Sequence, residues 1–181
     1  LIGGRRIDGL ITTPPADTDD FLLELVRKAG LPLVQIDPFT RSPQNAYVAG
    51  DDYQGAQQMT DYLIGLGHRR IAYLTGPRNH RATLDRLYGY RAALERAQIP
   101  FDPQLVIDSE FNFPGGYTGA KQAIMTGRKP SIIFAGADEA DWGALFAAQE
   151  MGYSVPGQLS VVGYGDLPQS QFIWPGLTTV C

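Results

Sequence analysis

The sequence has few of the residues that mark secreted, membrane or metal-binding proteins. Its single cysteine, Cys181, stands at the last of 181 positions, which excludes an internal disulfide and a thiolate metal cage. No stretch approaches the roughly 18 uninterrupted apolar residues of a membrane span, and no charged segment followed by an apolar run opens the chain. We therefore expect a protein of the reducing cytoplasm that does not associate with membranes.

Positive charge is scarce in the last third of the chain. No lysine or arginine follows Lys129, and the net charge of the whole sequence is −4. Seven of the 15 basic residues lie between Arg69 and Arg96 with two acidic ones, so this stretch carries a charge of +5. Nucleic-acid binding needs clustered positive charge over a whole face, so we expect no DNA binding by this chain alone. We interpret the basic stretch as a solvated helix face, apart from Arg86.

Motifs for catalysis are missing. The sequence has no phosphate-binding loop, no G-x-S-x-G elbow and no H-E-x-x-H pair. The segment Gly163-Tyr164-Gly165 lacks the third glycine of a dinucleotide fingerprint, and neither His68 nor His80 has a carboxylate or nucleophile at motif spacing. The sequence therefore predicts no enzyme activity, no cofactor and no metal site.

Short apolar runs alternate with longer stretches of helical period, which predict helices over residues 22–29, 56–66 and 84–94. Seven runs are strand candidates: residues 7–13, 33–37, 70–76, 105–111, 131–138, 159–166 and 177–180. Most are continuously apolar and rich in β-branched residues, as are parallel strands covered on both faces. Strand–helix alternation implies right-handed crossovers, so we expect an α/β fold with parallel sheets flanked by helices.

Two helix-poor segments interrupt this alternation. Residues 38–50 form an extended stretch with no helix to cover a sheet, so we place a subdomain boundary near Gln44. Residues 168–176 precede the last strand candidate, which would be a second crossing. The expected division is a partial amino-side subdomain (1–44), a carboxyl-side subdomain (45–176) and a strand crossing back (177–181), with a hinge and a cleft between the subdomains.

The two ends of the sequence suggest a piece of a longer protein. The chain begins at Leu1 rather than methionine, and it stops inside the strand candidate at 177–180. We therefore expect the fold to be truncated at both ends.

Ligands of open α/β sheets bind at the carboxyl ends of the strands, where this sequence places Asp37, Phe111, Asp138 and Asp166. Carboxylates, an arginine and an aromatic ring suit a polyhydroxylated ligand, because charged groups bond hydroxyls and the ring packs on C–H faces. Capping of the following helix or turn is the simpler role for Asp138 and Asp166.

Several stretches, in this order and spacing, resemble one family. The main ones are residues 65–77, Gly-Leu-Gly-His-Arg-Arg-Ile-Ala-Tyr-Leu-Thr-Gly-Pro, and 86–94, Arg-Leu-Tyr-Gly-Tyr-Arg-Ala-Ala-Leu; residues 8–11, 32–37, 159–164 and 177–180 support them. Together they resemble the effector-binding domain of lactose-repressor-type (LacI/GalR) transcription regulators. The resemblance covers nearly the whole chain.

The resemblance implies a two-subdomain, periplasmic-binding-protein-like fold that binds a small-molecule effector, in this case sugar-like. It also implies that a helix-turn-helix domain lies outside this chain. Operator DNA would then be a partner only through that missing domain.

Some ligand-binding residues of the family have counterparts in this sequence and others do not. Asp37 stands where a family aspartate reaches the effector, Arg86 matches an arginine that clamps hydroxyls or a carboxylate, and Phe111 matches a stacking aromatic. Ala137 replaces the family's asparagine and Gly165 its aspartate, which leaves Asp166 as the next carboxylate. Because unpaired buried hydroxyls cost about 1–3 kcal/mol each, an effector lacking the matching hydroxyls is favoured. The sequence does not identify the effector.

A dimer interface is the last expectation. Trp142 and Phe146 fall on the flank of a helix, where a large aromatic pair would otherwise face water. In regulators of this type the corresponding helix and the following loop form half of a two-fold interface, which would pair Trp142 and Phe146 with Phe172 and Ile173. We expect a homodimer, weakened here because the amino-side half of that interface lies in missing residues.

Two other classes share these features. A periplasmic sugar-binding protein of a transport system has the same fold and cleft but needs an export signal. A sugar-active or phosphosugar enzyme would use the carboxylates and the basic stretch, yet no acid/base pair has a spacing that places it.

Overall fold

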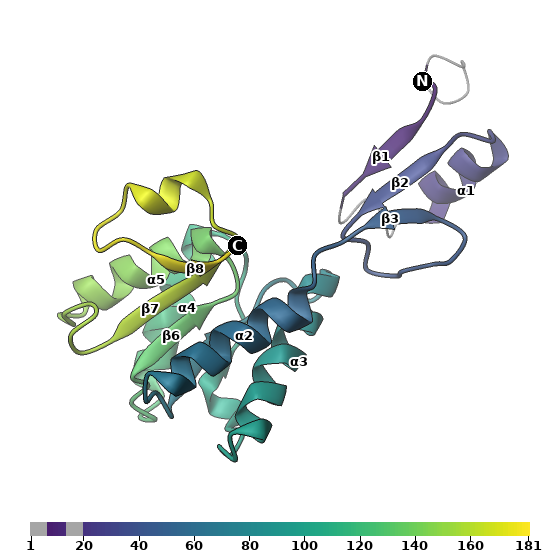
Figure 1. Cartoon of the computed structure of the whole chain (residues 1–181). Coiled ribbons are helices and arrows are strands. Elements are labelled where there is room, and N and C mark those ends of the chain that lie inside the picture. The colour runs from purple at the N-terminus through teal and green to yellow at the C-terminus, as the bar shows by residue number, and fades with distance from the viewer. Residues whose placement is uncertain (1–6, 14–19) are drawn as a thin grey trace. The chain divides into compact units, whose positions relative to one another are not determined.

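The computed structural model describes residues 7–13 and 20–181, which form two compact units (Figure 1). The first unit contains the described residues up to Asp51 together with Arg78–Leu84. The second contains Asp52–Pro77 and Asp85–Cys181. Each unit is built on its own parallel sheet, which confirms the α/β class.

The first unit has a three-stranded sheet. Its strands lie in the order β1 (Leu10–Thr12), β2 (Leu33–Ile36) and β3 (Ala46–Val48). Helix α1 (Asp20–Lys28) connects β1 to β2, and its Val26 is buried. The side-chain Nδ2 of Asn45 donates to Oε1 of the buried Gln35 at 3.0 Å, and this bond fixes the position of the residue that precedes β3.

The second unit has a five-stranded sheet, entirely parallel. The strand order is β5 (Val106–Ile107), β4 (Ile71–Leu74), β6 (Ile132–Ala135), β7 (Ser160–Tyr164) and β8 (Thr178–Val180). Its helices are α2 (Asp52–Gly65), α3 (Arg81–Arg96, whose first turn is grouped with the first unit), α4 (Phe113–Met125) and α5 (Asp138–Glu150).

Alternation along the strands divides the core of this unit into two layers. Tyr73 and Phe134 face α2 and α3, where they pack with Tyr90, while Leu74 and Ala135 pack among the alanines of α4 and α5. A sheet covered on both faces requires continuous apolar strands, and β4 and β6 are buried at every position. The apolar runs in the sequence therefore predicted the central strands β4 and β6 of this sheet.

Helices α4 and α5 pack closely because glycine stands at their contact. A Cβ atom at Gly116 would collide with the backbone of Ala140, so no larger residue fits there. Such glycines also weaken the apolar stripe by which a helix is identified, and α4 was not predicted from the sequence. The helix nevertheless begins with a regular cap, in which Oδ1 of Asn112 accepts from the Gly115 amide at 2.8 Å.

The observed boundaries differ from the expected division in two places. Residues 46–48, expected in the carboxyl-side subdomain, form β3 and pair with β2, so the first unit extends to Asp51 rather than ending at Gln44. Strand β8, expected to cross back, pairs with β7 in the second sheet. In both cases an extended segment forms backbone hydrogen bonds with the strand at a sheet edge. A helix-poor stretch of sequence does not show which sheet its segment will join.

Among the described residues, no helix is both long enough and apolar enough to cross a bilayer.

Candidate functional site

The strands of the second unit are parallel, so the segments that follow them share one edge of the sheet. Thr75 and Gly76 follow β4, Phe111 follows β5, Gly136 follows β6, and Tyr164 ends β7. The carboxyl edge of such a sheet is where α/β proteins bind ligands. This edge is therefore the candidate site.

Arg86 of α3 is held at this edge by two protein acceptors. Its Nε donates to Oδ1 of Asp52 at 2.7 Å, and its Nη1 donates to the backbone oxygen of Gly136. Both side chains of the ion pair are largely buried, with 15% of the Arg86 side chain and 5% of the Asp52 side chain exposed. The guanidinium is therefore fixed in direction, and its remaining N–H groups can donate to a ligand.

Two aromatic rings flank the guanidinium. The Arg86 Cζ atom lies 3.7 Å from the ring centroid of Tyr164 and 5.2 Å from that of Phe111. Both distances are within cation–π range, so the rings hold the planar group as well as shielding it from water. Burial raises the pKa of Tyr164 to about 12, which keeps its hydroxyl protonated at neutral pH.

The position of Phe111 depends on Gly76. A Cβ atom at Gly76 would collide with the Phe111 ring, so the ring can cover this strand end only above a residue without a side chain. Phe111, predicted as a ring that stacks on a ligand, thus lies beside the Arg86 guanidinium. Tyr164 and Asp52 were not predicted, although Tyr164 ends a strand and Asp52 opens a helix beside the subdomain boundary.

Asp37 belongs to the first unit. It follows β2 with a φ of 47°, and its Oδ1 accepts from the Gly50 amide at 3.2 Å. The carboxylate therefore steadies the backbone after β3 and stands at a strand end, where the sequence placed it.

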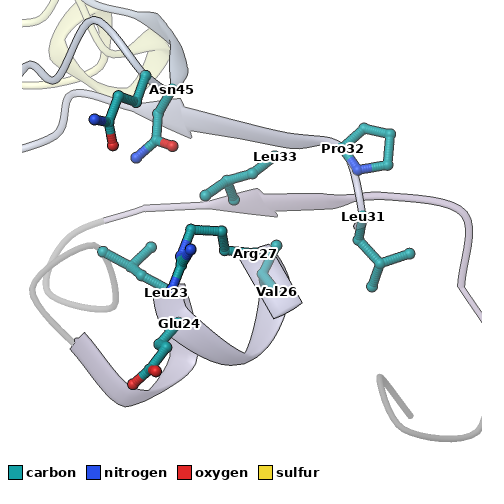
Figure 2. Close-up of a pocket in the computed structure, with 9 residues that line it drawn as sticks. Leu23, Glu24, Val26, Arg27, Leu31, Pro32, Leu33 and Asn45 are labelled. Atoms are coloured by element: carbon teal, nitrogen blue, oxygen red, sulfur yellow. The ribbon is translucent and has the colours of Figure 1, made fainter. Parts of the chain in front are cut away.

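The first unit also holds a pocket of about 690 Å³ beside α1 (Figure 2). Its lining includes Glu24, Arg27, Leu33 and Asn45. None of the predicted site residues lines it, and Glu24 is paired with Lys28 at 2.7 Å.

Asp138 differs from its expected role as a ligand contact. It is fully buried, and its oxygens accept from the Leu167 amide at 2.7 Å, the Ser170 hydroxyl at 3.0 Å and the Thr179 hydroxyl at 2.5 Å. The carboxylate therefore anchors the segment between β7 and β8 and leaves no exposed oxygen for a ligand. It does not cap α5, because Ala137 is the N-cap and makes no side-chain bond.

Asp166, the other carboxylate predicted beyond the strands, is exposed. It follows Gly165 in the segment after β7, with a φ of 49°, and its amide donates to the Thr179 hydroxyl at 3.3 Å. Of the predicted set, Arg86 and Phe111 are therefore brought together, and Asp166 lies on the segment after Tyr164.

The predicted association residues lie on and after α5. Trp142 donates from its indole to the Ser170 hydroxyl at 3.4 Å, and Phe146 packs beside Phe113 with ring centroids 5.9 Å apart. Phe146 is 52% exposed and Phe172 is 84% exposed, whereas Ile173 is half-buried. We call Trp142, Phe146, Phe172 and Ile173 the aromatic patch.

No metal site is evident where the structure can be described: residues 7–13 and 20–181 contain no group of three or more His, Cys, Asp or Glu side chains placed to hold an ion.

Another buried carboxyl group, that of Asp141, lies one turn after Asp138 in α5. Neither of its oxygens has a hydrogen-bond partner among the described residues. Burial, and secondarily the neighbouring Asp138, raise the pKa of Asp141 well above its ordinary value. The folded protein therefore holds a proton that the unfolded chain releases above about pH 4.

The raised pKa of Asp141 in the folded protein predicts that substitutions of Asp141 and of Asp138 have opposite effects on stability. Because the unfolded state loses the Asp141 proton first, stability should fall as the pH rises from about 4 toward the raised pKa. We expect Asp141→Ala to remove this decline and to stabilise the protein at pH 7 by about 1–3 kcal/mol. Asp138→Ala should destabilise it at the same pH, because three donors lose their acceptor. Urea unfolding between pH 4 and 8 measures both; equal destabilisation by the two variants would contradict the assignment.

Known proteins that are similar to this chain include LacI-family domains and transcriptional repressors. Residues 1–181 match the family described as periplasmic binding proteins and sugar-binding domain of the LacI family. The ribose operon repressor of Haemophilus influenzae is 29% identical over 98% of this chain and 53% of its own length. The transcriptional repressor PurR of Vibrio atlanticus is 30% identical over 99% of this chain and 54% of its own.

Solved structures of transcriptional regulators are similar to this chain in both sequence and fold. The complex of the transcriptional regulator CelR with cellobiose superposes with a TM-score of 0.91 at 32% identity, covering 98% of this chain and 55% of that one. The present chain spans about half the length of the curated relatives it matches.

Proposed function

The chain belongs to the family of periplasmic binding proteins and LacI-type sugar-binding domains, and we propose on this basis that it is the effector-binding part of a transcriptional regulator. A small molecule bound at the carboxyl edge of the second sheet would control how a DNA-binding domain outside this chain engages its operator. The proposed location of the whole regulator is the cytoplasm, where operator DNA lies.

The observation that carries the proposal is the fixed guanidinium of Arg86. Its Nε and Nη1 atoms are engaged by Asp52 and Gly136, and the Phe111 ring lies beside it. A directed donor next to an aromatic face suits a sugar-like molecule, whose hydroxyls accept hydrogen bonds and whose C–H groups pack on rings. Asp166 would supply an acceptor for a further hydroxyl.

The relatives support the same class of effector. CelR has been solved with cellobiose, and the Haemophilus influenzae protein is named for the ribose operon. Ala137 and Gly165 provide no polar side chain at two positions where family members have one. The proposed effector is therefore a sugar or related metabolite with fewer hydroxyls to satisfy.

The alternative functions are less well supported. The curated relatives are repressors, which does not favour a transport-system binding protein or a sugar-active enzyme. The ion-paired Arg86 and the fully bonded Asp138 offer no general acid or base.

A thermal-shift screen with free sugars, sugar phosphates and purines tests the effector site. An effector at 100 times its Kd stabilises the native state by about 2.7 kcal/mol. We expect Arg86→Ala to abolish the shift of any active compound, because the directed donor is lost. Each shift is measured from the melting temperature of the same variant without ligand, since removing Arg86 leaves Asp52 buried without its partner.

Arg78→Ala is the matched control, because Arg78, like Arg86, is an arginine between strands β4 and β5 in the chain. It should leave the ligand-induced shift intact. Equal losses in the two variants would mean that general positive charge, rather than a site at Arg86, accounts for binding.

We further propose that the regulator is a homodimer through the aromatic patch. Phe172 exposes 84% of its surface, and Trp174, two residues later, exposes 89%. Exposed large apolar side chains favour association, and a two-fold arrangement would align two DNA-binding domains with a palindromic operator.

Sedimentation velocity at micromolar concentration tests this interface. We expect Trp142→Glu and Phe172→Glu to shift the full-length regulator from dimer to monomer, because each places a charge in an apolar contact. Phe172 is exposed, so its substitution should leave the fold intact. A wild-type regulator that sediments as a monomer, or variants that dimerise equally well, would rule out this surface.

A further inference from the structure

A pocket in the second unit lies at the opposite end of the sheet from Arg86. Arg70 directly precedes β4, Leu105 directly precedes β5, and Arg128 lies in the segment that leads to β6. These residues line a pocket of about 610 Å³, a volume typical of small-molecule sites. Because the strands are parallel, the amino ends gathered here are remote from the carboxyl edge that holds Arg86.

Three arginines line this pocket, and each is tied to the protein by part of its guanidinium. Arg69 donates from Nη1 to the backbone oxygens of Ile64 at 2.8 Å and His68 at 3.0 Å. Arg70 donates from Nε to the backbone oxygen of Lys129 at 2.7 Å. Arg128 donates from Nε to Oε1 of Gln104 at 2.9 Å. These bonds position the guanidinium groups and leave further N–H donors on each of them.

The pocket carries excess positive charge. Asp102 is the one carboxylate among its lining residues, and both its oxygens are engaged, Oδ1 by the Gln104 amide at 2.9 Å and Oδ2 by Arg128 at 3.0 Å. Three arginines and one aspartate give the lining a formal charge of +2. Guanidinium groups brought to one pocket repel each other, and a multivalent anion relieves that repulsion.

The remaining lining is largely apolar. Ile99, Pro100 and Leu105 provide aliphatic surface beside the arginines, and Leu105 is 7% exposed. This combination fits a ligand with an anionic group joined to an organic part. Phosphate oxygens match the fork of N–H donors that arginine presents.

We propose that this pocket binds a phosphate ester of a small organic molecule, as a second site independent of the proposed effector site. The proposal gives a role to part of the basic stretch between Arg69 and Arg96, which the sequence alone suggested was a solvated face. It does not depend on the identity of the effector.

Calorimetric titration of the whole chain tests the proposal. The probes are glycerol phosphate, glucose phosphate and adenosine monophosphate, with glycerol, glucose, adenosine and inorganic phosphate as their separate parts. We expect at least one ester to bind more tightly than inorganic phosphate and than its uncharged part, with an affinity that falls as salt is added. Absence of binding by all three esters at about 10 mM, or equal affinity for inorganic phosphate, would overturn the proposal.

Substitutions then locate the binding. Arg70→Gln combined with Arg128→Gln should raise the Kd by about tenfold or more, through loss of charge-assisted hydrogen bonds. Arg96→Gln removes an arginine that pairs with Asp61 outside the pocket and should leave the Kd unchanged. Arg86→Ala should also leave it unchanged, which separates this site from the carboxyl edge. An unaltered Kd in the double variant, with its melting temperature preserved, would place the ester elsewhere.

Discussion

The buried ion pair between Asp52 and Arg86 is the constraint on which the candidate site depends. A guanidinium that is largely removed from water must be paired, and Asp52 is supplied by the first turn of α2 while Arg86 comes from α3. The same guanidinium donates to the backbone after β6 and stacks on Tyr164 at the end of β7. One side chain thus joins two helices to two strand ends and fixes the donors that remain for a ligand.

Other polar groups beyond the sheet have structural roles. Asp138 is fully buried and holds the segment between β7 and β8 through three hydrogen bonds. Its carboxylate therefore binds groups of the protein itself rather than a ligand. Asp141, one turn later, has no hydrogen-bond partner among the described residues, and burial raises its pKa well above the ordinary value. Two aspartates in one helical turn therefore differ in what their carboxyl groups contact: Asp138 accepts three hydrogen bonds, and Asp141 has no partner among the described residues.

Local patterns predicted the elements better than they predicted the contacts. The apolar runs located the strands of both sheets except β3, and the 3.6-residue period located α1, α2 and α3. Helix α4 was missed because Gly116 and its neighbouring glycines dilute its apolar stripe. Arg86 and Phe111 were predicted through the family resemblance. Asp52 and Tyr164 were not, because their relation to Arg86 arises only when α2, α3 and β7 meet in the folded unit.

The ion pair can be tested most directly by a double-mutant cycle on the free energy of unfolding, with Asp52→Asn, Arg86→Met and the two combined. Each single substitution leaves a buried charge without its partner and should cost about 3–5 kcal/mol. We expect the double variant to be more stable, by about 2 kcal/mol or more, than the sum of the two single losses implies. Strictly additive losses would show that the two side chains do not depend on each other, and would contradict the account of the site.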